Sequence, residues 1–106
     1  MQDLTTEHEA DAAFREPTAV LLKHGAHCPI SRAARAELDD FAARRPEVPV
    51  YRVEVTEHRA LSDALADRLG VEHQSPQAFV LRGGRTEWHA EHFDITADGL
   101  DRQVGR

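Results

Sequence analysis

The single cysteine of this chain, Cys28, lies where the sequence changes from a strand pattern to a helix pattern, and this junction constrains the fold most. Before it, the apolar run at residues 19–22 is typical of a buried strand, which we expect over residues 19–24. After it, Pro29 suits the first position of a helix, where a missing N–H costs nothing. Apolar or small side chains then recur at helical spacing: Ile30, Ala33, Ala34, Leu38, Phe41 and Ala42. The sequence therefore predicts that Cys28 lies at the amino-terminal end of a helix over residues 29–44.

This position favours the ionised form of the thiol. The unpaired N–H groups and the dipole of a helix start stabilise an anion, which lowers the pKa of a cysteine there. Lys23 and His27 are close in sequence and are expected to lower the pKa of Cys28 further. Ser31 follows one helical turn later, so we expect its hydroxyl near the sulfur. The alternative is that Cys28 is an ordinary buried apolar residue, as free cysteines commonly are.

The remaining segments predict alternating helices and strands. A first helix begins near Thr6, with acidic residues at its start, and ends before Pro17. Leucines spaced four apart form one face of a later helix, which Gly70 ends in the usual carboxyl-terminal position. Further strands are expected at residues 50–55, 78–82 and 86–90, and a final helix at residues 96–104.

The order of these elements predicts how the strands pair. A strand, a helix and a strand in succession imply a parallel pair with a right-handed crossover. The two glycines at residues 83–84 suit a hairpin turn, which makes the last two strands antiparallel. The predicted fold is therefore α/β, with a four-stranded mixed sheet flanked by helices. A length of 106 residues predicts a single domain over residues 1–106.

The string Cys28-Pro29-Ile30-Ser31 after a strand resembles the C-x-x-C motif of thioredoxins and glutaredoxins, with serine in place of the second cysteine. The longer string that begins at Lys23-His24, together with His-Gln-Ser-Pro-Gln at residues 73–77, resembles the monothiol bacilliredoxins, or YtxJ-like proteins, more closely. This resemblance covers about residues 14–100. It implies a thioredoxin-like fold of glutaredoxin size.

The resemblance also implies a second half of the site, in the loop before the strand at residues 78–82. In thioredoxin-like folds the proline here, Pro76 in this chain, follows a cis peptide bond and faces the active cysteine. Ser75 would then offer its backbone N–H and C=O to an extended substrate. His73 lies in the same loop, and we assign it with His27, Pro29, Ser75 and Pro76 to substrate binding. The alternative is a trans proline that simply begins a strand.

The function implied by the resemblance is that of an enzyme, a monothiol thiol–disulfide oxidoreductase that removes bacillithiol from S-bacillithiolated proteins. Cys28 is the expected nucleophile, and Ser31 and Lys23 are the expected catalytic residues beside it. A single cysteine excludes a dithiol mechanism within the chain. The expected partners are thiolated client proteins and a low-molecular-weight thiol; bacillithiol is a co-substrate, and no cofactor is expected.

Composition argues against several other classes. Thirteen basic and nineteen acidic side chains give a formal charge of −6, which disfavours a nucleic-acid partner. No apolar run reaches the length of a membrane span, and residues 1–8 do not have the pattern of a signal peptide. A single cysteine suits the reducing cytoplasm. The seven histidines lack the paired spacing of zinc ligands, so we expect no metal site.

Two other functions stay open at this point. One is an iron–sulfur carrier like the monothiol glutaredoxins, whose usual motif is Cys-Gly-Phe-Ser, whereas this chain has Pro29 and Ile30 after its cysteine. The other is a thioredoxin-fold binding module without enzymatic activity, which predicts an unreactive thiol.

Overall fold

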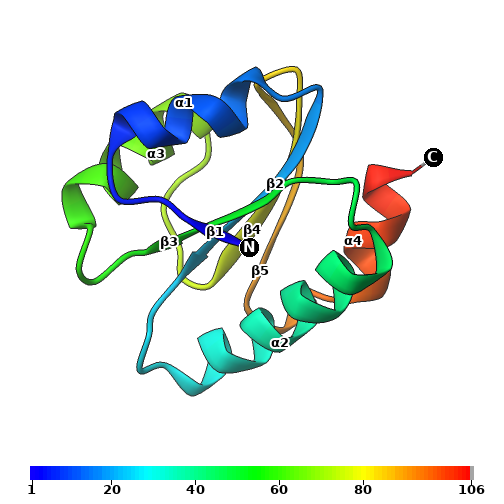
Figure 1. The fold of residues 1–106 in the computed structure, drawn as a ribbon. Helices are drawn as coiled ribbons and strands as arrows, with labels where there is room; N and C mark the ends of the chain where they lie inside the picture. Colours follow the sequence, from blue (N-terminus) through cyan, green and yellow to red (C-terminus); the bar gives the residue numbers. More distant parts are fainter. Residues whose placement is uncertain (106) are drawn as a thin grey trace.

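A mixed sheet runs through the centre of the molecule, with two helices packed on each of its faces (Figure 1). The computed structural model describes residues 1–105. The elements in chain order are β1 (Gln2–Asp3), α1 (Glu7–Arg15), β2 (Thr18–His24), α2 (Pro29–Arg44), β3 (Val50–Glu54), α3 (Arg59–Leu69), β4 (Gln77–Arg82), β5 (Arg85–Glu91), the short 3-10 helix η1 (His92–Asp94) and α4 (Ala97–Val104).

The strand order across the sheet is β1-β3-β2-β4-β5. β1, β3 and β2 run parallel, whereas β4 is antiparallel to both β2 and β5. The α/β class, the mixed sheet and its four predicted strands are confirmed. The predicted number of strands is wrong by one, because the two residues of β1 add an edge strand that pairs with Tyr51 and Arg52 of β3. β1 is too short and too exposed to produce an alternating pattern in the sequence.

The central strand β2 explains why residues 19–22 are continuously apolar. Val20 and Leu22 pack in the core beneath α2 and α4, whereas Ala19 and Leu21 pack in the core beneath α1 and α3. Both faces of β2 are therefore covered, and all four side chains are fully buried. By the same alternation Lys23, which follows Leu22, lies on the face of α1 and α3.

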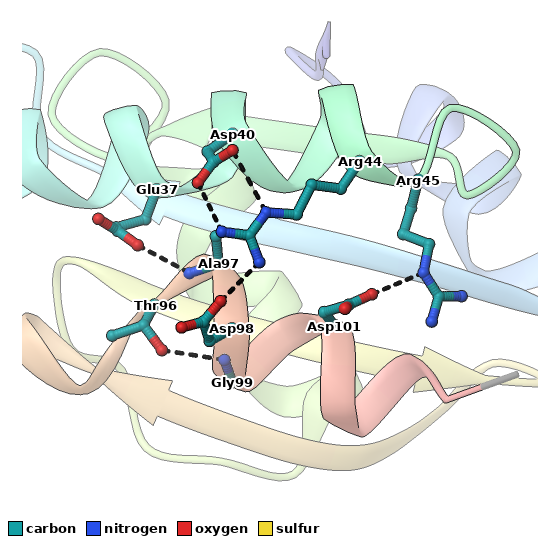
Figure 2. Close-up of polar contacts among 9 residues, drawn as sticks. All are labelled: Glu37, Asp40, Arg44, Arg45, Thr96, Ala97, Asp98, Gly99 and Asp101. Atoms are coloured by element: carbon teal, nitrogen blue, oxygen red, sulfur yellow. Dashed lines mark hydrogen bonds and ion pairs between the residues drawn. The ribbon is translucent and has the colours of Figure 1, made fainter.

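Polar contacts join helix α2, which carries Cys28 at its start, to α4 along their exposed edges. Figure 2 shows these contacts, which include hydrogen bonds of 2.6 Å from Arg44 to Asp98 and from Arg45 to Asp101. The backbone N–H of Ala97, in the first turn of α4, donates to Glu37 of α2 at 2.8 Å. Ion pairs at or near a protein surface contribute about 0–1 kcal/mol each, so the buried apolar side chains between the two helices supply most of the attachment.

Candidate active site

Cys28 is the residue immediately before helix α2, and Pro29 is the first residue of that helix, as the sequence predicts. The backbone of Cys28 is still extended, with φ −91° and ψ 125°. Its N–H donates to the carbonyl of Gly25 at 3.3 Å, which closes the connection from β2 into a tight turn. The thiol is half-buried at the end of this turn. The sulfur therefore lies at the helix start and remains within reach of a partner.

The pKa of Cys28 is lowered below its ordinary value, chiefly by a hydrogen bond from the backbone N–H of Ser31. Burial acts in the opposite direction. The N–H of Ile30, the hydroxyl of Ser31 and the positive charge of Arg35 lower the pKa further. The groups that stabilise the anion are thus the free N–H groups of the first helical turn, as expected for this position.

The hydroxyl of Ser31 is fixed by the turn that precedes the helix. Ser31 is fully buried, and its Oγ accepts a hydrogen bond of 3.0 Å from the backbone N–H of Gly25. Because that lone pair is engaged, the hydroxyl hydrogen is free to be donated to the sulfur. Ser31 thus has the place beside Cys28 that the sequence predicts.

Arg35 is a member of the site that the sequence analysis did not identify. Its Nη1 donates to His24 Nδ1 at 3.0 Å and to the carbonyl of Gly25 at 3.1 Å, and its Nη2 donates to the carbonyl of Ala26 at 3.4 Å. The guanidinium therefore holds the loop between β2 and α2 from the side of the helix. A spacing of four residues from Ser31 places Arg35 on the same helix face, and this spacing is the signal that would have identified it.

Lys23 lies on the other face of the sheet and is fully buried. Its Nζ donates to the carbonyl of Ser62 in α3 at 3.1 Å. Burial lowers the pKa of Lys23 to about 8, against the opposing charge of Asp63. The positive charge that acts on the thiol of Cys28 is that of Arg35.

His73 and Lys23 both contact the same residue, Ser62 of α3. The Nδ1 of His73 is 3.3 Å from the hydroxyl of Ser62, the residue whose carbonyl accepts from Lys23. Burial lowers the pKa of His73, and the charge of Lys23 lowers it further. Two residues that the sequence assigned to the site therefore form a cluster of their own on the α3 side, at the base of the loop that carries Ser75.

The loop before β4 reaches the thiol. The Ser75–Pro76 peptide bond is cis, as the resemblance implies. A Cβ placed on Gly25 would lie 3.6 Å from Cys28 Cβ, 3.8 Å from Ser31 Oγ and 4.0 Å from Ser75 Oγ, so these three side chains surround one point. Pro76 is buried, and its carbonyl accepts from the N–H of His92 at 3.0 Å.

The other two residues assigned to substrate binding flank the cysteine on the surface. His27 and Pro29 are both exposed, one on either side of Cys28. The structure therefore brings together Cys28, Ser31 and Ser75 at one point, with His27 and Pro29 at their edge. This arrangement provides a stabilised thiolate beside an open surface, which is what a nucleophile in thiol–disulfide exchange requires.

Comparison with known families identifies the group to which this site belongs. The family model of the monothiol bacilliredoxin BrxC matches residues 2–100. The chain belongs to the monothiol bacilliredoxin family. The match includes every residue of the site described above, and a bacilliredoxin with one cysteine fits the monothiol description.

Solved structures agree with this assignment. A protein described as a candidate oxidoreductase with a thioredoxin fold superimposes on this bacilliredoxin with a TM-score of 0.91 and 30% sequence identity, over 99% of this chain and 93% of the other. Thioredoxin from Fasciola hepatica superimposes with a TM-score of 0.78 and 14% identity, over 98% and 96% of the two chains. Thioredoxin from Trypanosoma brucei brucei superimposes with a TM-score of 0.77 and 14% identity, over 96% of this chain and 85% of the thioredoxin chain.

The two thioredoxins establish the fold alone, because their identity to this bacilliredoxin is low. Family and fold together identify the chain as a thiol oxidoreductase of the thioredoxin-like class. Within residues 1–105, no three His, Cys, Asp or Glu side chains gather closely enough to hold a metal ion. In the same part of the chain, no helix has both the length and the apolar character needed to span a bilayer.

Proposed function

We propose that this bacilliredoxin removes bacillithiol from mixed disulfides on client proteins, with Cys28 as the nucleophile. The observation that carries the proposal is the thiol at the start of α2, where N–H groups of the first turn and the Ser31 hydroxyl lower the pKa of Cys28. A lowered pKa supplies thiolate, which is the reactive form in exchange. An inert binding module would not need this stabilisation.

The first step transfers the small thiol to the enzyme. The Cys28 thiolate attacks the bacillithiol sulfur of the mixed disulfide. A sulfur–sulfur bond forms between Cys28 and bacillithiol as the bond between bacillithiol and the client breaks. The client cysteine leaves as a thiolate and takes a proton from water, so the client is reduced and Cys28 is oxidised.

The second step needs another molecule, because the chain has no second cysteine. The thiolate of a second bacillithiol, or of a partner protein, attacks the small-thiol sulfur bound to Cys28. Cys28 leaves as a thiolate, and the released product is a disulfide that contains the bacillithiol. Ser31 cannot act as the resolving group, but its hydroxyl stabilises the Cys28 thiolate both before the first step and after the second.

Ser75 is the proposed contact for the client backbone. Its side chain lies beside Cys28, and its N–H and C=O take part in no backbone hydrogen bond within residues 1–105. An extended client segment can therefore pair with Ser75 while its disulfide lies over the thiol. Lys23 and His73 act as positioning residues in this scheme, because their contacts with Ser62 support the base of the same loop. We further propose that the reaction takes place in a reducing cytoplasm.

The intact mass of the purified chain after exposure to oxidised bacillithiol, glutathione or coenzyme A tests the proposal. The expected result is one bacillithiol adduct per wild-type chain and no adduct on Cys28→Ser. The wild-type chain, but not Cys28→Ser, should remove bacillithiol from a thiolated client peptide. An unmodified wild-type chain together with slow alkylation by iodoacetamide would contradict the proposal and favour a binding module. Preferential adduct formation with glutathione or coenzyme A would reassign the small thiol.

A further inference from the structure

A pocket of ≈ 450 Å³ lies directly beside the loop that carries Cys28. This volume lies within the range of small-molecule sites. The pocket is bounded by β1 and the two residues after it, by β2 and β3 near their ends, by residues 57–58 before α3 and by the first turns of α2. Its lining residues include Ala26 and Arg35. No step of the proposed thiol–disulfide exchange uses this pocket.

The pocket is within reach of a group attached to the Cys28 sulfur. Ala26 lines the pocket. Ala26 and Cys28 are two positions apart in the chain, and two residues span at most about 7 Å, so their Cα atoms are no farther apart than that. Arg35 connects the two sites directly. It lines the pocket, and its charge acts on the Cys28 thiol.

His24 lies in the wall of the pocket and has a buried ring nitrogen without a hydrogen-bond partner among residues 1–105. His24 is 6% exposed and lines the pocket, and its Nδ1 accepts from Arg35, so the ring hydrogen is on Nε2. Nε2 is buried and has no hydrogen-bond partner among residues 1–105. Such a group is costly unless an acceptor is supplied. Because Nδ1 accepts from Arg35, the imidazole is neutral, and burial together with the charges of Arg35 and Arg52 lowers the pKa of His24.

The acidic side chains of the pocket are mostly occupied within the protein. Glu54 accepts from the backbone N–H groups of Ala26 at 2.9 Å and Thr56 at 2.5 Å, and Asp3 accepts from Arg52 at 2.5 Å. Only Glu57, which is exposed at the edge, has a carboxylate outside these contacts. The two arginines of the pocket are partly paired as well. Arg52 Nη1 and Arg35 Nε donate to no group among residues 1–105, and these are the donors left to a ligand.

We propose that this pocket binds the carboxylate-bearing part of the low-molecular-weight thiol while its sulfur is joined to Cys28, with Arg52 and Arg35 as the recognising groups and His24 in the wall beside them. The inference rests on the proposed function. Bacillithiol and glutathione both carry carboxylates, and the pocket therefore distinguishes such thiols from small uncharged ones. Ser75 then remains free to contact the client on the other side of the sulfur.

The test compares Arg52→Gln with the matched control Asp3→Asn. Both changes break the same ion pair, but only the first removes a pocket cation. Substrates are mixed disulfides of one uncharged peptide with bacillithiol, glutathione or 2-mercaptoethanol. Arg52→Gln should raise KM about tenfold for bacillithiol, or for both carboxylated thiols if the carboxylate alone is recognised. KM for 2-mercaptoethanol and the rate of Cys28 alkylation should stay unchanged. Asp3→Asn removes a pocket carboxylate and frees the Arg52 guanidinium, so KM for the carboxylated thiols should not rise in this variant.

An equal rise in KM for both variants, a rise for 2-mercaptoethanol as well, or no rise at all would overturn the proposal. A second measurement does not depend on turnover. S-methyl bacillithiol cannot exchange, and its titration onto the wild-type chain should shift the imidazole NMR signals of His24 more than those of His89 on β5. Shifts at His24 without any turnover would leave the pocket standing and refute the proposed function. Turnover with no shift at His24 would support the proposed function and refute the binding of the thiol in this pocket.

Discussion

The Oγ of Ser31 accepts a hydrogen bond of 3.0 Å from the backbone N–H of Gly25, six residues earlier in the chain. This bond joins the end of β2 to the first turn of α2 and orients the serine hydroxyl toward Cys28. One buried side chain thus serves both the fold of the turn and the electrostatics of the thiol. The consequences of removing it can be measured separately.

Ser31→Ala should lower stability and raise the pKa of Cys28. The buried N–H of Gly25 loses its acceptor, which costs about 1–3 kcal/mol. The thiolate loses one of its donors. Urea unfolding measures the first effect, and the pH dependence of iodoacetamide alkylation measures the second. Ser62→Ala removes another buried serine hydroxyl and serves as the control; an equal pKa shift in both variants would contradict the role of Ser31.

Arg35→Gln should also raise the pKa of Cys28, but by less than Ser31→Ala. Arg35 lowers this pKa through its charge, which acts less strongly than the hydrogen bond from the Ser31 hydroxyl. The backbone N–H of residue 31 is kept in Ser31→Ala, so only the hydroxyl contribution is lost. Added salt should reduce the difference between Arg35→Gln and wild type, because it screens the charge. The alkylation midpoint at two ionic strengths gives the answer. Arg32→Gln, on an exposed position of the same helix, should leave the midpoint where it is in wild type.

Lys23→Met should flatten the dependence of stability on alkaline pH. Burial lowers the pKa of Lys23 to about 8 in the folded chain, while the unfolded chain has the ordinary value of about 10.4. Between these values the unfolded state binds more protons, so wild-type stability rises with pH across this window. The urea midpoint, measured from pH 7.5 to 10.5, should rise in wild type and change less in Lys23→Met. Parallel curves for the two proteins would refute this account of Lys23.

Gly84→Ala should destabilise the protein more than Gly83→Ala. Both residues have positive φ in the hairpin between β4 and β5, 59° at Gly83 and 80° at Gly84, so each alanine meets backbone strain of about 1–3 kcal/mol. Only at Gly84 would the new Cβ also collide, 2.6 Å from the carbonyl oxygen of Phe14. Thermal unfolding of the two variants measures the difference, and equal melting temperatures would show that the contact with Phe14 is unimportant.

The junction at Cys28 was predictable from sequence because its determinants are local. A buried apolar run, a proline at the first helical position and helical spacing afterwards specify both elements without knowledge of the rest of the chain. The alternation of side chains along β2 also determines on which face of the sheet Lys23 lies. Since Leu22 lies under α2, the next side chain has to lie on the opposite face.

The features that the sequence did not predict depend on contacts between distant segments. β1 forms only because residues 2–3 meet Tyr51 and Arg52 along the edge of the sheet. Arg35 becomes part of the site only when the loop after β2 folds back against the helix, where its carbonyls accept from the guanidinium. His24 is predicted from the sequence only as the last residue of a strand. That its Nε2 is buried without a partner among residues 1–105 depends on the folded surroundings of the strand end.

The serine at residue 31, in the place where a dithiol protein has its second cysteine, also determines what the oxidation state of Cys28 responds to. A dithiol that closes its own disulfide consumes one small-molecule disulfide and releases two thiols, so its equilibrium depends on the square of the thiol concentration. Cys28 exchanges one sulfur for one, with a single thiol released. Its oxidised fraction at equilibrium is therefore governed by the ratio of disulfide to thiol in its surroundings and is unaffected when both are diluted together.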